Sequence, residues 1–468
     1  MAMATRQDVA TTIADLVRRA RQAQQVYAQA TQEQVDALTA RVAWAGVRPD
    51  VAQRLAETLV AESGMGCVPD KIQKLRTKIK GAYRDMKGRK SVGVVSDDPR
   101  TGIVKIAKPV GVIGGILPVT NGEATPFVKV LGALKTRNAI ILSPHPKGVQ
   151  TCNLAVAAIR AVLKKHGWPE DLVIGIDPVC RDASMELMKQ CDLVIATGSM
   201  GLVNAAYTSG TPCFGVGAGN AVCVIDETAD LRETAGMIMR SKTFDHASSC
   251  STENALAIQE SVYDAMLREL EAVGGYLVNA EEKARLQAAM WNSETQALNR
   301  AIVARPAAVI AEVAGIRLPA GRSFFLVPET GIGKGFPFSG EKLSVVAAVY
   351  RWKTFAEAID LVNRGTAHGG PGHSCSIHTA DEARARELAL QARVARIMIR
   401  QPQSLGNSGS WTNGMPMSLT LGCGTWGGNI SSSNITWEQM LNFTWVSYPI
   451  SSTEPSDEEL FGAVMREE

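Results

Sequence analysis

Short continuous runs of apolar residues alternate with amphipathic segments through the first half of the chain. Four apolar runs predict buried strands, and each is followed by a segment whose apolar residues have helical spacing. The predicted strand and helix pairs are 110–118 with 125–137, 139–145 with 149–167, 171–176 with 183–190, and 192–198 with 200–210. Because these strands are apolar on both faces, the alternation predicts a parallel sheet covered by helices on both sides.

The alternation continues in the second half with different spacing. Further strands are predicted at 276–280, 323–328, 344–352, 375–379 and 395–400, and helices at 355–364 and 381–392. Residues 6–45 are predicted to be helical, residues 101–118 form two β-rich pieces broken at Pro109, and the acidic segment after residue 450 predicts a loose tail with one short helix.

Length and composition narrow the class of protein. A chain of 468 residues exceeds one ordinary hydrophobic core, so two or three domains are expected. A net charge of +3 argues against a dedicated nucleic-acid binder. No apolar run reaches the length of a membrane span, and no signal peptide is predicted. Nine cysteines at scattered spacing indicate no disulfide framework and favour the reducing cytoplasm.

Two glycine-rich segments raise the question of a nucleotide site. "GVGAGN" (215–220) has GxGxG spacing and is predicted to precede a strand, so it fails the dinucleotide fingerprint. "ATGSMG" (196–201) follows a predicted strand and opens a helix, so Gly198 and Ser199 can face a phosphate at a helix N-terminus. A glycine turn after a strand is also common in proteins that bind no ligand there.

"GHSCSIH" places His373, Cys375 and His378 close together. On a strand His378 points away from the other two, so ordinary packing is a better interpretation than a metal site. No metal is predicted.

Cys250 stands out among the nine cysteines because its neighbours are Ser248, Ser249, Ser251 and Thr252. A free cysteine usually behaves as a small buried hydrophobe. This polar loop instead offers access and hydrogen-bond donors, which a nucleophilic thiolate needs. A plain loop with an incidental cysteine is the alternative.

The chain resembles the CoA-acylating branch of the aldehyde dehydrogenase superfamily from about residue 8 to 447. It is similar to the aldehyde dehydrogenase half of bifunctional aldehyde/alcohol dehydrogenases and to propionaldehyde dehydrogenases. The segments that carry the resemblance are "AESGMG", "LKTRNAIILSPHP", "AAYTSGTPCFGVGAGN", "VIDETAD", "SKTFD" with Cys250 and Glu253, "EKLS", "GHS" and "LTLGCGTWGGN".

The resemblance implies a Rossmann-type cofactor domain, a second α/β catalytic domain and a small oligomerisation hairpin. It assigns the nucleophile to Cys250, the oxyanion donor to Asn121 and the cofactor ribose contact to Glu341. The other residues that it places along the nicotinamide cofactor are Ile116, Leu117, Pro118, Val119, Thr120, Ser143, Gly198, Ser199, Gly217 and Leu421.

The implied reaction is a reversible oxidation of a short-chain aldehyde with NAD or NADP and coenzyme A, through a thioester on Cys250. Relatives that hydrolyse the thioester carry a glutamate that activates water, whereas the corresponding segment 215–220 has no carboxylate here. A hydrolytic enzyme with a base from Glu253 or Glu123 remains an alternative, as does a non-catalytic scaffold, which the presence of Cys250, Asn121 and Glu341 disfavours.

Three departures from the family pattern are visible. His246-Ala247 stands where relatives often have Asn-Gly, and Gly340 stands where they often have histidine. Arg400 and Gln401 replace an asparagine and a small residue. A guanidinium can bind a carboxylate, sulfonate or phosphate, so Arg400 predicts an anionic substrate such as sulfoacetaldehyde. A surface ion pair, a contact to coenzyme A, and acetaldehyde or propionaldehyde as substrate are the alternatives.

The expected domains are a cofactor domain at 1–240 with an oligomerisation hairpin near 101–111, a catalytic domain at 241–425 and a C-terminal segment at 426–468. Relatives are dimers or tetramers, so a cytoplasmic homodimer or homotetramer is expected, without nucleic-acid or membrane partners. No additional N-terminal helix for encapsulation is predicted. Lys147 can meet a 2′-phosphate or be a solvated surface residue, which leaves NAD or NADP open.

Overall fold

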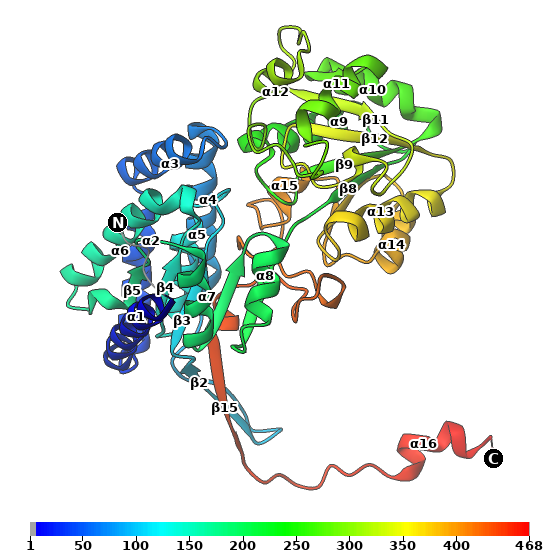
Figure 1. The fold of residues 1–468 in the computed structure, drawn as a ribbon. Coiled ribbons are helices and arrows are strands. Elements are labelled where there is room, and N and C mark those ends of the chain that lie inside the picture. The colour runs from blue at the N-terminus through cyan, green and yellow to red at the C-terminus, as the bar shows by residue number, and fades with distance from the viewer. Residues whose placement is uncertain (1–5, 468) are drawn as a thin grey trace.

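Two parallel sheets and one antiparallel sheet organise the chain, and the computed structural model describes residues 6–467 (Figure 1). The first parallel sheet has the order β5-β4-β3-β6-β7. Its strands are β3 (Val112–Ile116), β4 (Ala139–Ser143), β5 (Val173–Gly175), β6 (Leu193–Thr197) and β7 (Cys213–Val216). The strand order changes direction between β3 and β6, and open α/β sheets bind ligands at such a switch point.

Helices cover this first sheet. They are α1 (Arg6–Tyr27), α2 (Gln32–Val47), α3 (Pro49–Ser63), α4 (Val68–Met86), α5 (Thr125–Lys135), α6 (Val149–Lys165), α7 (Arg181–Gln190) and α8 (Met200–Tyr207). Local sequence fixes their ends: Thr31 and Gln34 form a capping box at α2, and Gly64 ends α3 with a left-handed φ of 72°. The four strand and helix pairs predicted in the first half are confirmed.

The second parallel sheet has the order β10-β11-β12-β9-β8-β13-β14. Its strands are β8 (Ala221–Ile225), β9 (Glu253–Gln259), β10 (Gly275–Leu277), β11 (Phe324–Pro328), β12 (Val346–Trp352), β13 (Cys375–His378) and β14 (Ile397–Ile399). Its helices are α9 (Leu231–Thr243), α10 (Tyr263–Ala272), α11 (Ala280–Met290), α12 (Ala307–Ala314), α13 (Phe355–Gly369), α14 (Glu382–Gln391) and α15 (Gln403–Gly406). The strands and helices predicted in the second half are confirmed.

The boundary between the two units lies earlier than the sequence predicts. The second hydrophobic core begins at Val222 and includes Ala235 and Ile238 of α9. A boundary between residues 240 and 241 would cut through α9, because β8 and α9 already belong to the second unit. The prediction missed β7, which precedes the glycine-rich link, whereas the strand predicted after the link is confirmed as β8. "GVGAGN" (215–220) thus begins within β7 and precedes β8, contrary to the prediction that no strand comes before it.

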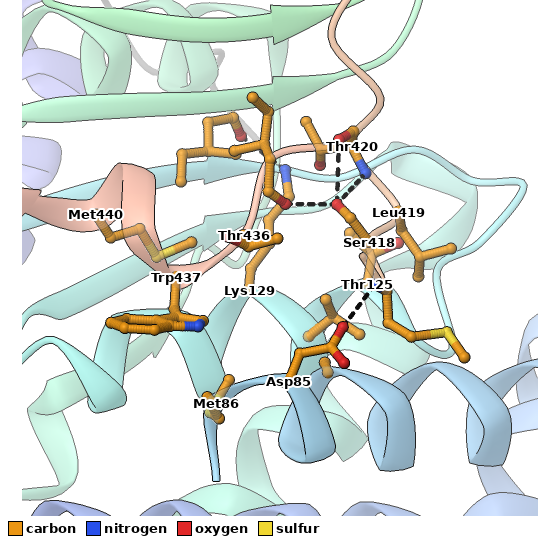
Figure 2. Close-up of a pocket in the computed structure, with 16 residues that line it drawn as sticks. Asp85, Met86, Thr125, Lys129, Ser418, Leu419, Thr420, Thr436, Trp437 and Met440 are labelled. Carbon is orange, nitrogen blue, oxygen red and sulfur yellow. Dashed lines mark hydrogen bonds between the residues drawn. The ribbon is translucent and has the colours of Figure 1, made fainter. Parts of the chain in front are cut away.

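The chain returns to the first unit after α15. Leu419, Trp437 and Met440 belong to the first hydrophobic core, so this return begins before residue 426, where the C-terminal segment is predicted to start. The backbone N–H of Met417 donates to Asp85 of α4 at 2.8 Å. Figure 2 shows the junction, which encloses a cavity of about 20 Å³, enough for about one water.

Lys129 of α5 ties the two strands of the switch point together. Its buried ammonium donates to the carbonyls of Ile116 and Ile195, each at 2.7 Å. Burial without a carboxylate partner lowers the pKa of Lys129 to about 7. The side chain therefore fixes the point at which the chain leaves β3 and enters residues 117–121.

The antiparallel sheet extends away from both parallel sheets (Figure 1). It consists of β1 (Gly93–Asp98), β2 (Ile103–Pro109) and β15 (Leu441–Ser447), in the order β1-β2-β15. Residues 101–111 are not a hairpin by themselves: the hairpin is β1 with β2, and β15 pairs along the other edge of β2.

The C-terminal tail follows β15 as an extended segment that ends in α16 (Asp457–Met465), which confirms the predicted short helix (Figure 1). None of the described helices is long and apolar enough to cross a membrane.

Candidate active site

A cavity of about 940 Å³ lies at the switch point of the first sheet and at the start of β9 in the second. Its lining comes from the turns after β3, β6 and β7, from the loop before β9 and from residues 401–412. Of the residues predicted from the resemblance, those that line it are Leu117, Pro118, Val119, Thr120, Asn121, Gly198, Ser199, Gly217, Cys250, Glu341 and Leu421.

Three predicted site residues do not line the cavity. Ile116 is buried at the end of β3, and Ser143 is buried with its hydroxyl 2.7 Å from that of Ser184. Arg400 donates to the carbonyl of Thr379 at 2.7 Å and pairs with the carboxylate of Glu382 at 2.7 Å. Arg400 therefore forms the surface ion pair that was one of its alternatives, and its proposed contact with an anionic substrate is not supported.

Cys250 lies half-buried on the loop between α9 and β9, beside an imidazole that the sequence analysis did not assign to the site. Nε2 of His373 is 3.1 Å from Sγ of Cys250. The sequence interpretation assigned His373 to ordinary packing. The sequence signal that could have identified His373 is the "GHS" segment. It is one of the segments that carry the family resemblance, but no role was assigned to its histidine.

The thiol and the imidazole are both neutral near pH 7. Burial and, to a smaller extent, the nearby carboxyl of Glu341 raise the pKa of Cys250 to about 12. Burial lowers the pKa of His373 to about 3, and the guanidinium of Arg396 acts in the same direction. The imidazole is therefore unprotonated, with no standing ion pair, and the 3.1 Å contact places Nε2 where the thiol proton leaves when attack begins.

A second set of polar groups supports this imidazole. We call His373, Ser374, Gln403 and Glu253 the His373 network. Nδ1 of His373 is 2.8 Å from the hydroxyl of Ser374, which accepts from the amide of Gln403 at 3.4 Å. The backbone N–H of Gln403 donates to Glu253 at 3.2 Å, and the hydroxyl of Ser241 donates to the same carboxyl at 2.6 Å.

A buried ionic group lies on the Asn121 side of the site. We call Lys71, Lys74, Glu123 and Asp245 the Asp245 cluster. Lys74 is 2.5 Å from Asp245 and 3.2 Å from Glu123, and Lys71 is 3.0 Å from Asp245. Although burial alone would raise the pKa of Asp245, the two ammonium groups lower it.

Lys74 also orients the predicted oxyanion donor. Its ammonium donates to Oδ1 of Asn121 at 2.8 Å, which fixes which end of the amide is the oxygen. Within the described residues Nδ2 of Asn121 makes no hydrogen bond, so it is available to a ligand in the cavity.

The loop before Cys250 has an unusual backbone. Asp245, His246 and Ala247 have φ values of 49°, 51° and 60°, a left-handed run without glycine. Gly219 approaches the nucleophile from the other side, where an added Cβ would lie 2.1 Å from the carbonyl oxygen of Cys250. A glycine at 219 is therefore required by the close approach of these two backbones.

Comparison with known proteins agrees with this geometry. The profile of the aldehyde dehydrogenase family matches residues 2–422. The chain belongs to the aldehyde dehydrogenase family. Among its relatives, the sulfoacetaldehyde dehydrogenase (acylating) of Cupriavidus necator is 46% identical over 459 residues, covering 97% of this chain and 93% of the relative.

Two further relatives place this aldehyde dehydrogenase within the family. The sulfoacetaldehyde dehydrogenase (acylating) of Bilophila wadsworthia is 42% identical and covers 96% of this chain and 98% of its own. The crystal structure of an acetylating aldehyde dehydrogenase from Geobacillus thermoglucosidasius superposes with a TM-score of 0.92 at 34% identity, covering 97% of this chain and all of that one.

The cavity of this aldehyde dehydrogenase suits a dinucleotide. Gly198 and Ser199 line it where α8 begins, and Ser199 caps that helix, so free backbone N–H groups and the helix dipole favour a phosphate. Glu341 accepts a hydrogen bond from the backbone N–H of Gly219 through Oε1 at 3.0 Å, and Oε2 makes no hydrogen bond within the described residues. These donors and this carboxyl fit the phosphates and the ribose of a nicotinamide cofactor.

The cavity lining is electropositive. The Lys and Arg residues along it are Lys74, Lys78, Lys147, Arg240 and Arg300. Glu341 is the one carboxyl group lining it in the described part of the chain, and burial raises the pKa of Glu341 to about 8. Lys74 is paired with buried carboxylates and burial lowers the pKa of Lys78 to about 7, so the attraction for anionic ligands comes from Lys147, Arg240 and Arg300.

Metal ligation is not built into the described residues, since no group of three or more His, Cys, Asp or Glu side chains is arranged to hold an ion. His378 lies buried on β13, apart from the site.

Proposed function

We propose that this protein oxidises a short anionic aldehyde, with sulfoacetaldehyde as the leading candidate, to an acyl-CoA in a reversible reaction. The balanced reaction is aldehyde, coenzyme A and NAD(P)⁺ giving acyl-CoA, NAD(P)H and a proton. The observation that carries the proposal is the pairing of Cys250 with a neutral His373 at 3.1 Å, in a cavity that fits a dinucleotide. The acylating activity and the sulfonate are supported by the names of the two most similar relatives described above.

The first step is attack of Cys250 on the aldehyde carbon. His373 accepts the thiol proton as the S–C bond forms. The negative charge that develops on the carbonyl oxygen is met by Nδ2 of Asn121, which Lys74 holds in place, and by the backbone N–H of Cys250. Loss of one donor of this kind typically lowers turnover about 100- to 1000-fold.

The nicotinamide ring, when bound, supplies the acceptor for the hydride that leaves the aldehyde carbon. Residues 117–121, Gly198, Ser199, Gly217, Glu341 and Leu421 would hold that cofactor. The chain retains the oxidised acyl group as a thioester on Cys250.

The acceptor of the acyl group is coenzyme A and not water. A hydrolytic route needs a carboxylate base near the thioester. Glu123 and Glu253, the bases considered from sequence, are buried in the Asp245 cluster and the His373 network and do not line the cavity. Because the raised pKa of Glu341 leaves it largely protonated near pH 7, it is a poor base for water. The coenzyme A thiol is the stronger nucleophile.

Assembly is proposed from the antiparallel sheet. Within the described residues the outer edge of β15 has no strand partner, and Phe443 and Trp445 on it are exposed. An uncovered strand edge with apolar side chains favours pairing with another chain. We therefore expect a homodimer or homotetramer. The free cysteines fit a location in the cytoplasm.

The decisive test replaces the nucleophile. Cys250→Ala should abolish acyl-CoA formation and NAD(P)H production while circular dichroism and unfolding remain like the wild type. Cys180→Ala is the matched control, since this thiol is exposed and away from the cavity. CoA-dependent NAD(P)H production retained by Cys250→Ala would contradict the proposal, and free acid released by the wild type without coenzyme A would support the hydrolytic alternative.

A further inference from the structure

Two arginines that line the cavity, Arg240 and Arg300, have no hydrogen-bond or ion-pair partner within the described residues. Arg240 is exposed in the last turn of α9 and lines the cavity. Within residues 6–467 its guanidinium makes no hydrogen bond and no ion pair.

The other cations that line the cavity either have hydrogen-bond or ion-pair partners or lie on the cofactor side of the cavity. Lys74 is held by the Asp245 cluster, and the ammonium of Lys78 donates to the carbonyls of Ser408 and Gly409 at 2.9 and 2.6 Å. Burial lowers the pKa of His145, and the charges of Lys147 and Arg300 lower it further. Both cations therefore lie near His145, beyond the end of β4 on the cofactor side.

Arg240 belongs to the substrate side of the cavity. From α9 the chain passes directly into the left-handed loop and Cys250, and Phe244 and Ser248 of that loop line the same cavity. The next residue, Ser241, is tied to Ser404 of α15 by hydroxyl groups 2.9 Å apart. This bond holds the end of α9 against residues 404–412, which line the cavity and follow β14.

We propose that Arg240 is the residue that binds the anionic group of the aldehyde. This rests on the proposed function and names the subsite that the function requires. A planar guanidinium presents a fork of N–H donors that matches two oxygens of a sulfonate. The aldehyde carbon would then lie toward Cys250, while the cations near His145 remain for the phosphates of the cofactor and coenzyme A.

The test measures selectivity. The ratio of kcat/KM for sulfoacetaldehyde to kcat/KM for propionaldehyde should fall about 10- to 100-fold in Arg240→Gln, as expected for a lost charge-assisted hydrogen bond. Arg240→Lys should lie between, since it keeps the charge and loses the fork. Arg232→Gln is the matched control: Arg232 is exposed on the same helix and does not line the cavity, so the ratio should not change.

A second readout does not depend on turnover. Ethanesulfonate should slow the alkylation of Cys250 by iodoacetamide, followed by mass spectrometry of its peptide, in the wild type and in Arg232→Gln but not in Arg240→Gln. Equal losses on both aldehydes, or protection that survives in Arg240→Gln, would overturn the assignment. If the wild type oxidises no aldehyde with coenzyme A, the proposed function fails, while the protection experiment still decides the sulfonate site.

Discussion

The Asp245 cluster holds Asn121, whereas the His373 network ends at the nucleophile, and the two treat buried charge differently. In the Asp245 cluster each ammonium lies within 4 Å of a carboxylate, and Lys74 touches both Asp245 and Glu123. In the His373 network the groups are held by hydroxyl, amide and backbone partners. Both are buried, so solvation cannot explain the difference.

The contrast shows how one site obtains two kinds of group. Buried charges that are paired stay ionised and hold geometry, here the amide of Asn121. Burial favours the neutral form, which keeps His373 unprotonated at neutral pH and raises the pKa of Glu253 despite the nearby ammonium of Lys242. One cluster therefore positions a donor, and the other supplies a base.

The largest expected effect comes from the His373 network. His373→Gln should lower kcat about 100- to 10,000-fold, the usual contribution of a positioned general base, with the fold intact by circular dichroism. Because the pKa of His373 lies near 3, its base form is present throughout pH 5 to 8. The wild-type kcat/KM should therefore show no loss from this group as pH falls from 8 to 5.

The control is His166→Gln, a histidine outside the cavity on the C-terminal side of α6. An acid limb near the ordinary histidine pKa of about 6.5, present in the wild type and absent in His373→Gln, would contradict the neutral-network interpretation.

The Asp245 cluster is tested through Lys74 and Asn121. Asn121→Ala should lower kcat about 100- to 1000-fold with little change in KM, because its donor acts on charge that develops in the transition state. If Lys74 acts by orienting that amide, Lys74→Met should also lower kcat, and the double variant should lose less than the product of the two single losses. Unfolding by urea separates this effect from the loss of the ion pairs of Lys74 with Asp245 and Glu123.

Multiplicative losses in the double variant would show that Lys74 and Asn121 act independently. A raised KM with unchanged kcat in Asn121→Ala would remove Asn121 from the oxyanion role.

Much of the fold follows from the sequence because buried parallel strands leave a strong pattern. The apolar runs 139–145 and 192–198 contain β4 and β6 with their bounds nearly as observed. The missed element, β7, is joined to β8 by only a glycine-rich link, so no polar or helical segment separates the two strands. The unit boundary was misplaced for the same reason.

The site was predictable where family motifs mark it and not where contacts depend on tertiary structure. Cys250, Asn121 and most residues predicted to line the cofactor do line one cavity, because each belongs to a motif in sequence. His373 meets Cys250 from a separate loop beside β13, which only packing reveals. The two arginines show the converse. Arg400 is unusual for the family and so drew attention, yet the structure pairs it with Glu382. Arg240 has no such sequence signal, and only the structure shows that it is unpaired and lines the cavity.

The smallest effect concerns the strained loop that joins the two clusters. His246 has a φ of 51°, a conformation that asparagine tolerates better than histidine, and relatives often carry asparagine there. His246→Asn should therefore raise the free energy of unfolding by about 0.5 kcal/mol. This is a fraction of the about 1 to 2 kcal/mol that the left-handed conformation costs an ordinary residue. His166→Asn, at a φ of −108°, should show no such gain in urea unfolding at an unchanged m-value.

If the Asp245 cluster imposes the left-handed run, kcat should stay within about twofold, because Asp245 still anchors the loop through Lys71, Lys74 and Ser248. A stabilised variant with a large loss of kcat would instead show that the strain itself positions Cys250.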